Sequence, residues 1–267
     1  MAFLIGGINF EGSLGDISAY RMKGSERTVV RLKGGPSKKK IKTDPRMVNT
    51  RRTMSEFGAA SKAAARVSNM IKHRAGWSTQ GVQGALTAVM MHLRRSDTQS
   101  TWGQRGILFS SNPKILEGFS LNGGKKTFNT CINSPMRATL SREGLSAQIE
   151  IPALIPGVNL TLPEDRPQYR LVAELITVPD FMFAQEQNRF DPMPGYSHFD
   201  TACIETGWYA SRKGSPETTL DLNLDVVPPD EHFALMLSIG LQLGVKHDGD
   251  TVELVKKVGA AKILAMV

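Results

Sequence analysis

The sequence has 267 residues, enough for one large domain or for two smaller ones that each bury a core. Hydrophobic residues make up 40% and charged residues 22%, a composition that excludes a disordered or fibrous chain. The net charge of +8 is unevenly distributed, because residues 1–128 hold 22 Lys and Arg against 7 Asp and Glu, whereas residues 129–267 hold 11 against 18. We therefore predict two domains, a basic region at 1–128 and an acidic one at 129–267.

The first residues and the two cysteines bear on the cellular compartment. Residues 1–7 lack the charged segment and long apolar stretch of a signal peptide, and no apolar run reaches the length of a membrane span. We expect a chain that is cytoplasmic at synthesis, with incorporation into an assembled particle as an open alternative. Cys131 and Cys203 have no CxxC spacing, so they predict two reduced, mostly buried thiols.

Residues 17–32 predict a β-hairpin, with strands at 17–22 and 27–32 joined by a turn at 23–26 that contains Gly24. Arginines punctuate both strands, which is typical of a ribbon with at least one exposed face. An isolated hairpin is only marginally stable in water, so this one needs another element to pack against.

A basic connector and two helices are expected next. Residues 34–40 combine Gly and Pro with three consecutive lysines and predict a flexible linker. Asp44 and Pro45 are typical of a helix N-terminus, and Gly76 of its end, so a helix is expected over 44–75.

A second helix is predicted over residues 79–95, although Gly81 and Gly84 weaken its start. With the first it would form an αα-hairpin. Residues 103–128 are rich in Gly, Ser and Asn and predict loops or short irregular structure, which is where the domain boundary is placed.

After residue 129 the apolar pattern changes to a period of two. This alternation and the intervening turns predict seven or eight short antiparallel strands. The expected strands lie at 136–142, 145–151, 169–178, 199–209, 218–224, 232–243, 251–258 and 261–267. The predicted fold class is α+β: an N-terminal β-hairpin and two-helix arm followed by an antiparallel β-sandwich of immunoglobulin-like or fibronectin-like architecture.

No segment of the sequence has the residues of a catalytic, cofactor or metal site. The best metal candidate combines Asp191, His198, Asp200 and Cys203, but hard oxygen and soft sulfur ligands mix there without a recognisable order, and a polar loop is the preferred interpretation. Residues 122–127 resemble a phosphate-binding loop without its register. We predict that the chain is not an enzyme and uses no cofactor.

The adjacent carboxylates Glu164 and Asp165, and likewise Asp230 and Glu231, are interpreted as solvated turns.

The basic segment carries most of the functional argument. Residues 21–74 hold 16 Lys and Arg but only three acidic residues. These cations are interpreted as an assembly or polyanion-binding surface. The candidate residues are Arg21, Arg27, Arg31, Lys38, Lys39, Lys40, Arg46, Arg51 and Arg52.

The preferred hypothesis is a non-enzymatic structural subunit that assembles into a homo-oligomeric particle or filament, phage-derived or part of an injection apparatus. In this hypothesis the basic arm of one copy docks on the acidic sandwich of the next. The alternative is a nucleic-acid-binding or packaging protein that uses the same arm. A third is a carbohydrate-binding sandwich with Trp208, Tyr209 and Tyr196 as stacking residues.

Several motifs of the first 58 residues resemble those of an uncharacterised family of bacteroidete proteins. They are the residues Gly-Ser-Leu-Gly-Asp-Ile-Ser-Ala-Tyr at 12–20, Lys-Gly at 23–24, Val-Arg at 30–31, Lys-Gly-Gly-Pro at 33–36 and Asn-Thr-Arg-Arg at 49–52, followed by Glu-Phe-Gly at 56–58. The family is similar in its Gly-rich hairpin start and its β-rich C-terminal part. It has no established activity, so the resemblance implies an origin and a fold but no catalytic residue.

Overall fold

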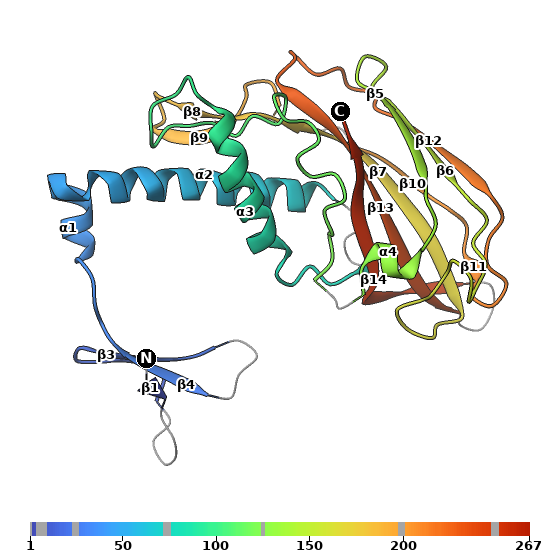
Figure 1. The fold of residues 1–267 in the computed structure, drawn as a ribbon, viewed down its shortest axis with the longest axis horizontal. Helices are drawn as coiled ribbons and strands as arrows, with labels where there is room; N and C mark the ends of the chain where they lie inside the picture. The colour runs from blue at the N-terminus through green and yellow to red at the C-terminus, as the bar shows by residue number, and fades with distance from the viewer. Residues whose placement is uncertain are drawn as a thin grey trace. The chain divides into compact units, whose positions relative to one another are not determined.

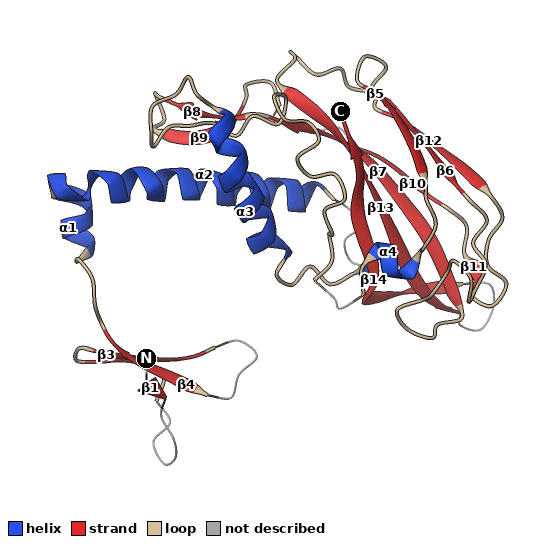
Figure 2. Ribbon diagram, viewed as in Figure 1, coloured by secondary structure: helices blue, strands red, loops and turns tan. Residues whose placement is uncertain are grey.

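The computed structural model describes residues 2–3, 10–22, 27–71, 76–123, 126–196, 201–246 and 251–267. The chain divides into two compact units, residues 1–51 and residues 52–267. The boundary predicted from composition, between residues 128 and 129, lies inside the second unit. Figure 1 shows the elements along the chain, and Figure 2 separates helices from strands.

The first unit contains a four-stranded antiparallel sheet in the order β1-β4-β3-β2. Its strands are β1 (Ala2–Phe3), β2 (Gly12–Leu14), β3 (Ile17–Arg21) and β4 (Thr28–Leu32). The predicted hairpin corresponds to β3 and β4, while its turn at 23–26 lies outside the described residues. The additional strands β1 and β2 supply the packing partners that an isolated hairpin lacks.

Two short helical elements follow, α1 (Lys38–Thr43) and the 3₁₀ helix η1 (Pro45–Met47). The prediction of a flexible linker over 34–40 was wrong for its last three residues. Ser37 caps α1 by accepting a hydrogen bond from the backbone N–H of Lys40, which stabilises the start of the helix. Asp44 accepts from the backbone N–H of Arg46, as expected for a helix N-cap, but it caps η1.

Two longer helices, α2 (Val48–Met70) and α3 (Val82–Leu93), confirm the predicted pair. The 3₁₀ helix η3 (Arg94–Ser96) extends α3 by one turn. Helix α2 buries one face that is made largely of alanines, and its last helical residue comes before the predicted stop at Gly76. The residues between Ile71 and Gly76 are outside the described part.

The second unit is built on a sheet in the order β10-β7-β13-β14, with β11 also paired to β7. Its strands are β7 (Gln168–Pro179), β10 (Thr201–Glu205), β11 (Tyr209–Ala210), β13 (Phe233–Lys246) and β14 (Val252–Met266).

A smaller sheet has the order β12-β6-β5. Its strands are β5 (Arg137–Ser141), β6 (Ser146–Ile151) and β12 (Thr218–Asn223). The remaining elements of the unit are the β8 (Phe181–Ala184) and β9 (Arg189–Pro192) hairpin and the single-turn helix α4 (Phe128–Cys131).

The central strands of the larger sheet, β7 and β13, are buried on both faces. Odd-numbered residues of β13, such as Leu235 and Leu237, belong to the core shared with β5, β6 and β12. Even-numbered residues, such as Ala234 and Met236, belong to a second core with α2 and α3. Three layers result, helices on one face and the smaller sheet on the other, and the predicted α+β class with a sandwich-like part is confirmed.

The strand predictions need correction in three places. In the described part of the strand expected at 199–209, two strands are present, β10 and β11, with residues 206–208 between them. The expected strands 251–258 and 261–267 are one continuous strand, β14, because Gly259 is not a turn residue. A Cβ on Gly259 would lie 2.1 Å from the carbonyl oxygen of Leu241, so this glycine allows close backbone approach within the sheet. The β8–β9 hairpin was missed, since each strand has only four residues.

Gly240 of β13 provides a test of the packing between the larger sheet and the helical layer. A Cβ at Gly240 would lie 2.5 Å from Cζ3 of Trp77, a ring that is 4% exposed. We expect Gly240→Ala to lower the free energy of unfolding by about 1–3 kcal/mol, because the ring must move within a packed core. Chemical denaturation followed by tryptophan fluorescence measures this loss.

Gly58→Ala is the matched control. Nothing lies within 4 Å of a Cβ at this position inside α2, so the variant should be more stable by about 0.5–1 kcal/mol. Equal effects of the two substitutions would contradict the packing described for Trp77.

Candidate assembly surface

The arginines of the first sheet do not form one stripe. Arg21 ends β3 and its Nε lies 3.4 Å from Oε1 of Glu11, an exposed ion pair. Arg31 lies on β4 with its guanidinium 5.4 Å from the ring centroid of Tyr20. The pairing register places Arg21 and Arg31 on opposite faces of the sheet, while Arg27 is exposed just before β4 begins.

Helix α1 concentrates four lysines in six residues. Because successive residues of a helix are 100° apart, Lys38, Lys39 and Lys40 point in different directions. All three are exposed, as is Arg46 in η1. Within the described part of the chain, no hydrogen bond or ion pair engages these four side chains. They are therefore available cations around α1 and η1.

Arg51 has a different role from the one expected of it. Its Nη1 donates to the carbonyl oxygens of Ile41, at 2.8 Å, and of Asp44, at 2.9 Å. Both carbonyls lie at the C-terminal end of α1, where the last carbonyl groups have no partner within the helix. The carbonyl oxygen of Asp44 also accepts from the backbone N–H of Met47. Arg51 thus fixes α1 against the start of α2 and is half-buried, so it belongs to the scaffold of the first unit.

One face of the first sheet also exposes an apolar row. Leu14, Ile17 and Leu32 are cross-strand neighbours on β2, β3 and β4, and they are 68%, 37% and 74% exposed. Ala19 and Val29 are the buried apolar residues among the described positions of this unit. The described residues of the first unit therefore bury little apolar surface and leave a row of large apolar side chains in water.

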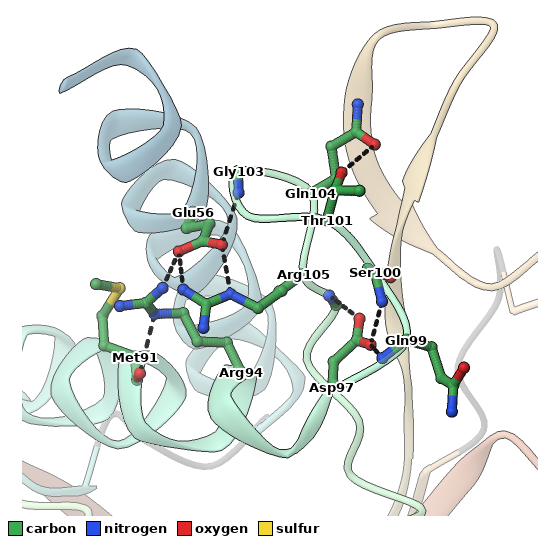
Figure 3. A network of polar contacts seen from close by, with 11 residues as sticks. Glu56, Met91, Arg94, Asp97, Gln99, Ser100, Thr101, Gly103, Gln104 and Arg105 are labelled. Atoms are coloured by element: carbon green, nitrogen blue, oxygen red, sulfur yellow. Dashed lines mark hydrogen bonds and ion pairs between the residues drawn. The ribbon is translucent and has the colours of Figure 1, made fainter. Parts of the chain in front are cut away.

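In the second unit, a buried ionic network holds the loop at 97–106 on α2 (Figure 3). Glu56 is fully buried and binds the guanidinium groups of both Arg94 and Arg105. The bond from Arg105 is bidentate, with Nε 2.7 Å from Oε1 and Nη2 2.8 Å from Oε2. The backbone N–H of Gly103 also donates a hydrogen bond to Oε1 of Glu56, at 2.9 Å.

Asp97 organises the same loop. Its carboxylate accepts backbone hydrogen bonds from Gln99, Ser100 and Gly106 (Figure 3). Burial alone would raise the pKa of Asp97, but the bond from Gly106 and those from Ser100 and Gln99 together lower it. The charged form is thus the one that the loop requires.

The network determines the environment of Arg52. The guanidinium of Arg52 lies 5.5 Å from the ring centroid of Trp102, which is 42% exposed. A Cβ on Gly103 would lie 2.8 Å from Cγ of Arg52, and Gly103 has a φ of +99° that favours glycine. Arg52 is therefore a fixed cation on the surface of the second unit.

The sandwich carries an acidic and apolar groove of about 500 Å³. It lies where the β5–β6 turn meets the segment that leads into β13. The groove is lined by Arg142, Glu143, Leu145, Val227, Pro228, Pro229, Asp230, Glu231 and Phe233. The two carboxylates interpreted above as a solvated turn, Asp230 and Glu231, are therefore part of this groove.

Ionic, aromatic and hydrogen-bonding contacts hold the residues of the groove in place. The guanidinium of Arg142 lies 4.5 Å from the ring centroid of Phe233 and pairs with Glu231 at 2.9 Å. Tyr196 donates its hydroxyl to Oδ1 of Asp230 at 2.9 Å. Burial first, and then this bond to Asp230, raise the pKa of Tyr196. Hydrogen bonds from the His232 backbone and Tyr196 outweigh desolvation and lower the pKa of Asp230.

The three aromatic residues proposed above for carbohydrate stacking are buried or packed against other side chains. Tyr196 is buried, Tyr209 packs with Tyr169 at a centroid distance of 5.6 Å, and the guanidinium of Arg170 lies 4.6 Å from the ring centroid of Trp208. These three aromatic side chains do not form an exposed stacking platform.

Of the metal candidate, Asp191 and Cys203 are described, whereas His198 and Asp200 are not. The described ranges contain no group of three or more potential metal ligands. Cys131 is buried, which raises its pKa, but Cys203 is exposed, so the prediction of burial was wrong for the second cysteine.

Comparison of the chain with models of known families, with curated proteins and with solved structures found no match. This outcome agrees with the resemblance to a family without an established activity. Across the described residues, no helix has both the length and the apolar character needed to cross a membrane.

The Glu56 network gives a stability prediction. We expect Glu56→Gln to lower the free energy of unfolding by about 3–5 kcal/mol, because two guanidinium groups then lose the buried carboxylate that pairs with them. Urea denaturation measures the loss. The matched control is Glu164→Gln, which removes the exposed pair with Arg166 and should cost about 0–1 kcal/mol. Similar losses for both variants would show that the buried network does not hold the loop.

Proposed function

We propose that this chain is a non-enzymatic structural subunit that self-assembles into a particle or filament through its basic N-terminal unit. The observation that carries the proposal is the combination of charge and exposure in residues 1–51. These residues hold 11 Lys and Arg against 4 Asp and Glu, although they are only about a fifth of the chain.

Apolar exposure in the same unit supports the proposal. Twelve large apolar side chains are clearly exposed in the described part of the chain, and five of them lie in the first unit. They are Leu14, Ile17, Met22, Leu32 and Val48. A segment of this size with so few buried side chains gains stability by covering its apolar face with another surface.

Charge supports a second copy of the chain as that surface. The second unit as a whole is close to neutral, with 22 Lys and Arg against 21 Asp and Glu. Its acidic residues are concentrated in the sandwich part, where residues 129–267 carry a net charge of −7. A basic unit and an acidic sandwich in one sequence allow head-to-tail contacts between copies.

Deletion of residues 1–47 tests the proposal. The full chain should sediment as a species larger than a monomer, and the deletion variant, which retains all of α2, should sediment as a monomer with unchanged circular dichroism of the second unit. Analytical ultracentrifugation measures both. A full-length protein that remains monomeric at high concentration would contradict the proposal.

The exposed lysines around α1 favour nucleic-acid binding as a second candidate function. Binding of duplex DNA would then weaken steeply with salt, with a slope of about −0.9 in log K against log salt for each phosphate contacted. Changing Lys38, Lys39 and Lys40 to Glu should abolish retention, whereas the same change at Lys114, Lys213 and Lys256 in the second unit should have a much smaller effect. Fluorescence anisotropy at low and high salt measures this, and no binding at low salt would exclude the candidate.

A further inference from the structure

We infer that the groove between the β5–β6 turn and the start of β13 is the receiving surface for the first unit of a second copy. This inference rests on the proposed self-assembly and assigns its acceptor site. The lining residues of the groove hold one another in place, since the guanidinium of Arg142 lies over the ring of Phe233 and pairs with Glu231.

The charges of the groove and of the first unit are complementary, which supports the first unit of a second copy as the occupant of the groove. Three carboxylates line the groove, and its one lining cation, Arg142, is already paired with Glu231. Glu143 is exposed, and the Glu231 side chain is 86% exposed, so both are accessible to an incoming cation. The first unit, with a net charge of +7, presents Lys38, Lys39 and Lys40 without partners among the described residues.

Apolar surface is complementary as well. Val227, which is 77% exposed, lines the groove together with Pro228 and Pro229, and the preceding residue Val226 is 56% exposed. The row formed by Leu14, Ile17 and Leu32 needs an apolar surface of this kind. Covering both removes exposed side chains from water at about 25 cal/mol for each Å² buried.

The contact is head-to-tail, because the first unit and the groove are different surfaces of one sequence. A contact of this type leaves a free first unit at one end of a complex and a free groove at the other, and it continues into a ring or a filament. Reversing the charge of one of the two surfaces in every copy should therefore prevent growth.

Two complementary variants of the full chain test the inference. The first changes Lys38, Lys39 and Lys40 to Glu and blocks the donor unit. The second changes Glu143 and Glu231 to Lys and blocks the groove. Each alone should self-associate at least about tenfold more weakly, because like charges then face each other. Mixed together, they should co-assemble in alternation, since the unchanged unit of one variant meets the unchanged groove of the other and the two reversed surfaces also carry opposite charges.

Matched controls distinguish the groove from general charge effects. Glu186 and Glu217 are exposed elsewhere on the second unit, and changing both to Lys alters the net charge by the same amount as the groove variant. This control should assemble as the wild type does. Combining all five reversals of the two test variants in one chain should restore assembly, because the charges are then exchanged.

The outcomes separate this inference from the proposed function. If deletion of residues 1–47 abolishes assembly but the groove variant assembles normally, the groove assignment is wrong and self-assembly through the first unit stands. If the wild type is monomeric, both fail. A photo-reactive residue at Val227 should cross-link to residues 10–51 of an isotope-labelled second copy, and cross-links only within one chain would overturn the inference.

Discussion

Twelve consecutive buried residues in β13, Phe233 to Gly244, are the constraint on which the second unit depends. A strand has two faces, so burial along its whole length requires a layer on each side. The smaller sheet covers one face and the helices α2 and α3 cover the other. For this reason the helices that composition assigns to a basic arm belong to the same compact body as the sandwich.

That arrangement explains why the Glu56 network lies where it does. Helix α2 buries alanines against the sheet, and small side chains allow close approach but supply little apolar area. Glu56 and its two arginines connect the start of this helix to η3 and to the loop at 97–106. A buried ion pair of this kind costs desolvation, but it selects one arrangement of the segments that meet there.

Periodicity in the sequence was sufficient to predict most helices and strands, but it did not predict how they pack against one another. The alternation from Leu235 to Leu243 predicted a strand, and β13 confirms it. The same alternation did not show that Ala234, Met236 and the even-numbered positions are also buried, because small and polar residues such as Ser238 and Gln242 interrupt the apolar pattern on that face. The segments 251–258 and 261–267 were predicted as separate strands, and the close contact of Gly259 with the backbone of Leu241, which is visible only in three dimensions, shows that they are continuous.

The candidate surface shows the same limit. Lysines at 38–40 were identified from their number alone, and the structure describes them as exposed. Arg51 could not be distinguished from them by sequence, since its role depends on two carbonyl oxygens at the end of α1. The groove was missed because Glu143 and Glu231 are distant in sequence and meet only through the placement of β6 and β13. These strands belong to two different sheets, and packing of one sheet against the other creates a site that no local sequence pattern records.

Exposed apolar side chains lie beside charged ones on both the first unit and the sandwich. Their presence favours assembly over a simple polyanion-binding role. A cation that binds phosphate needs exposure but no neighbouring apolar surface. The first sheet nevertheless exposes Leu14, Ile17 and Leu32 in one cross-strand row, and the groove exposes Val227 beside its carboxylates. Apolar and charged surfaces that occur together on both sides are typical of a protein interface, with an apolar centre and a polar rim. Nucleic acid would engage the lysines but leave the apolar row in water.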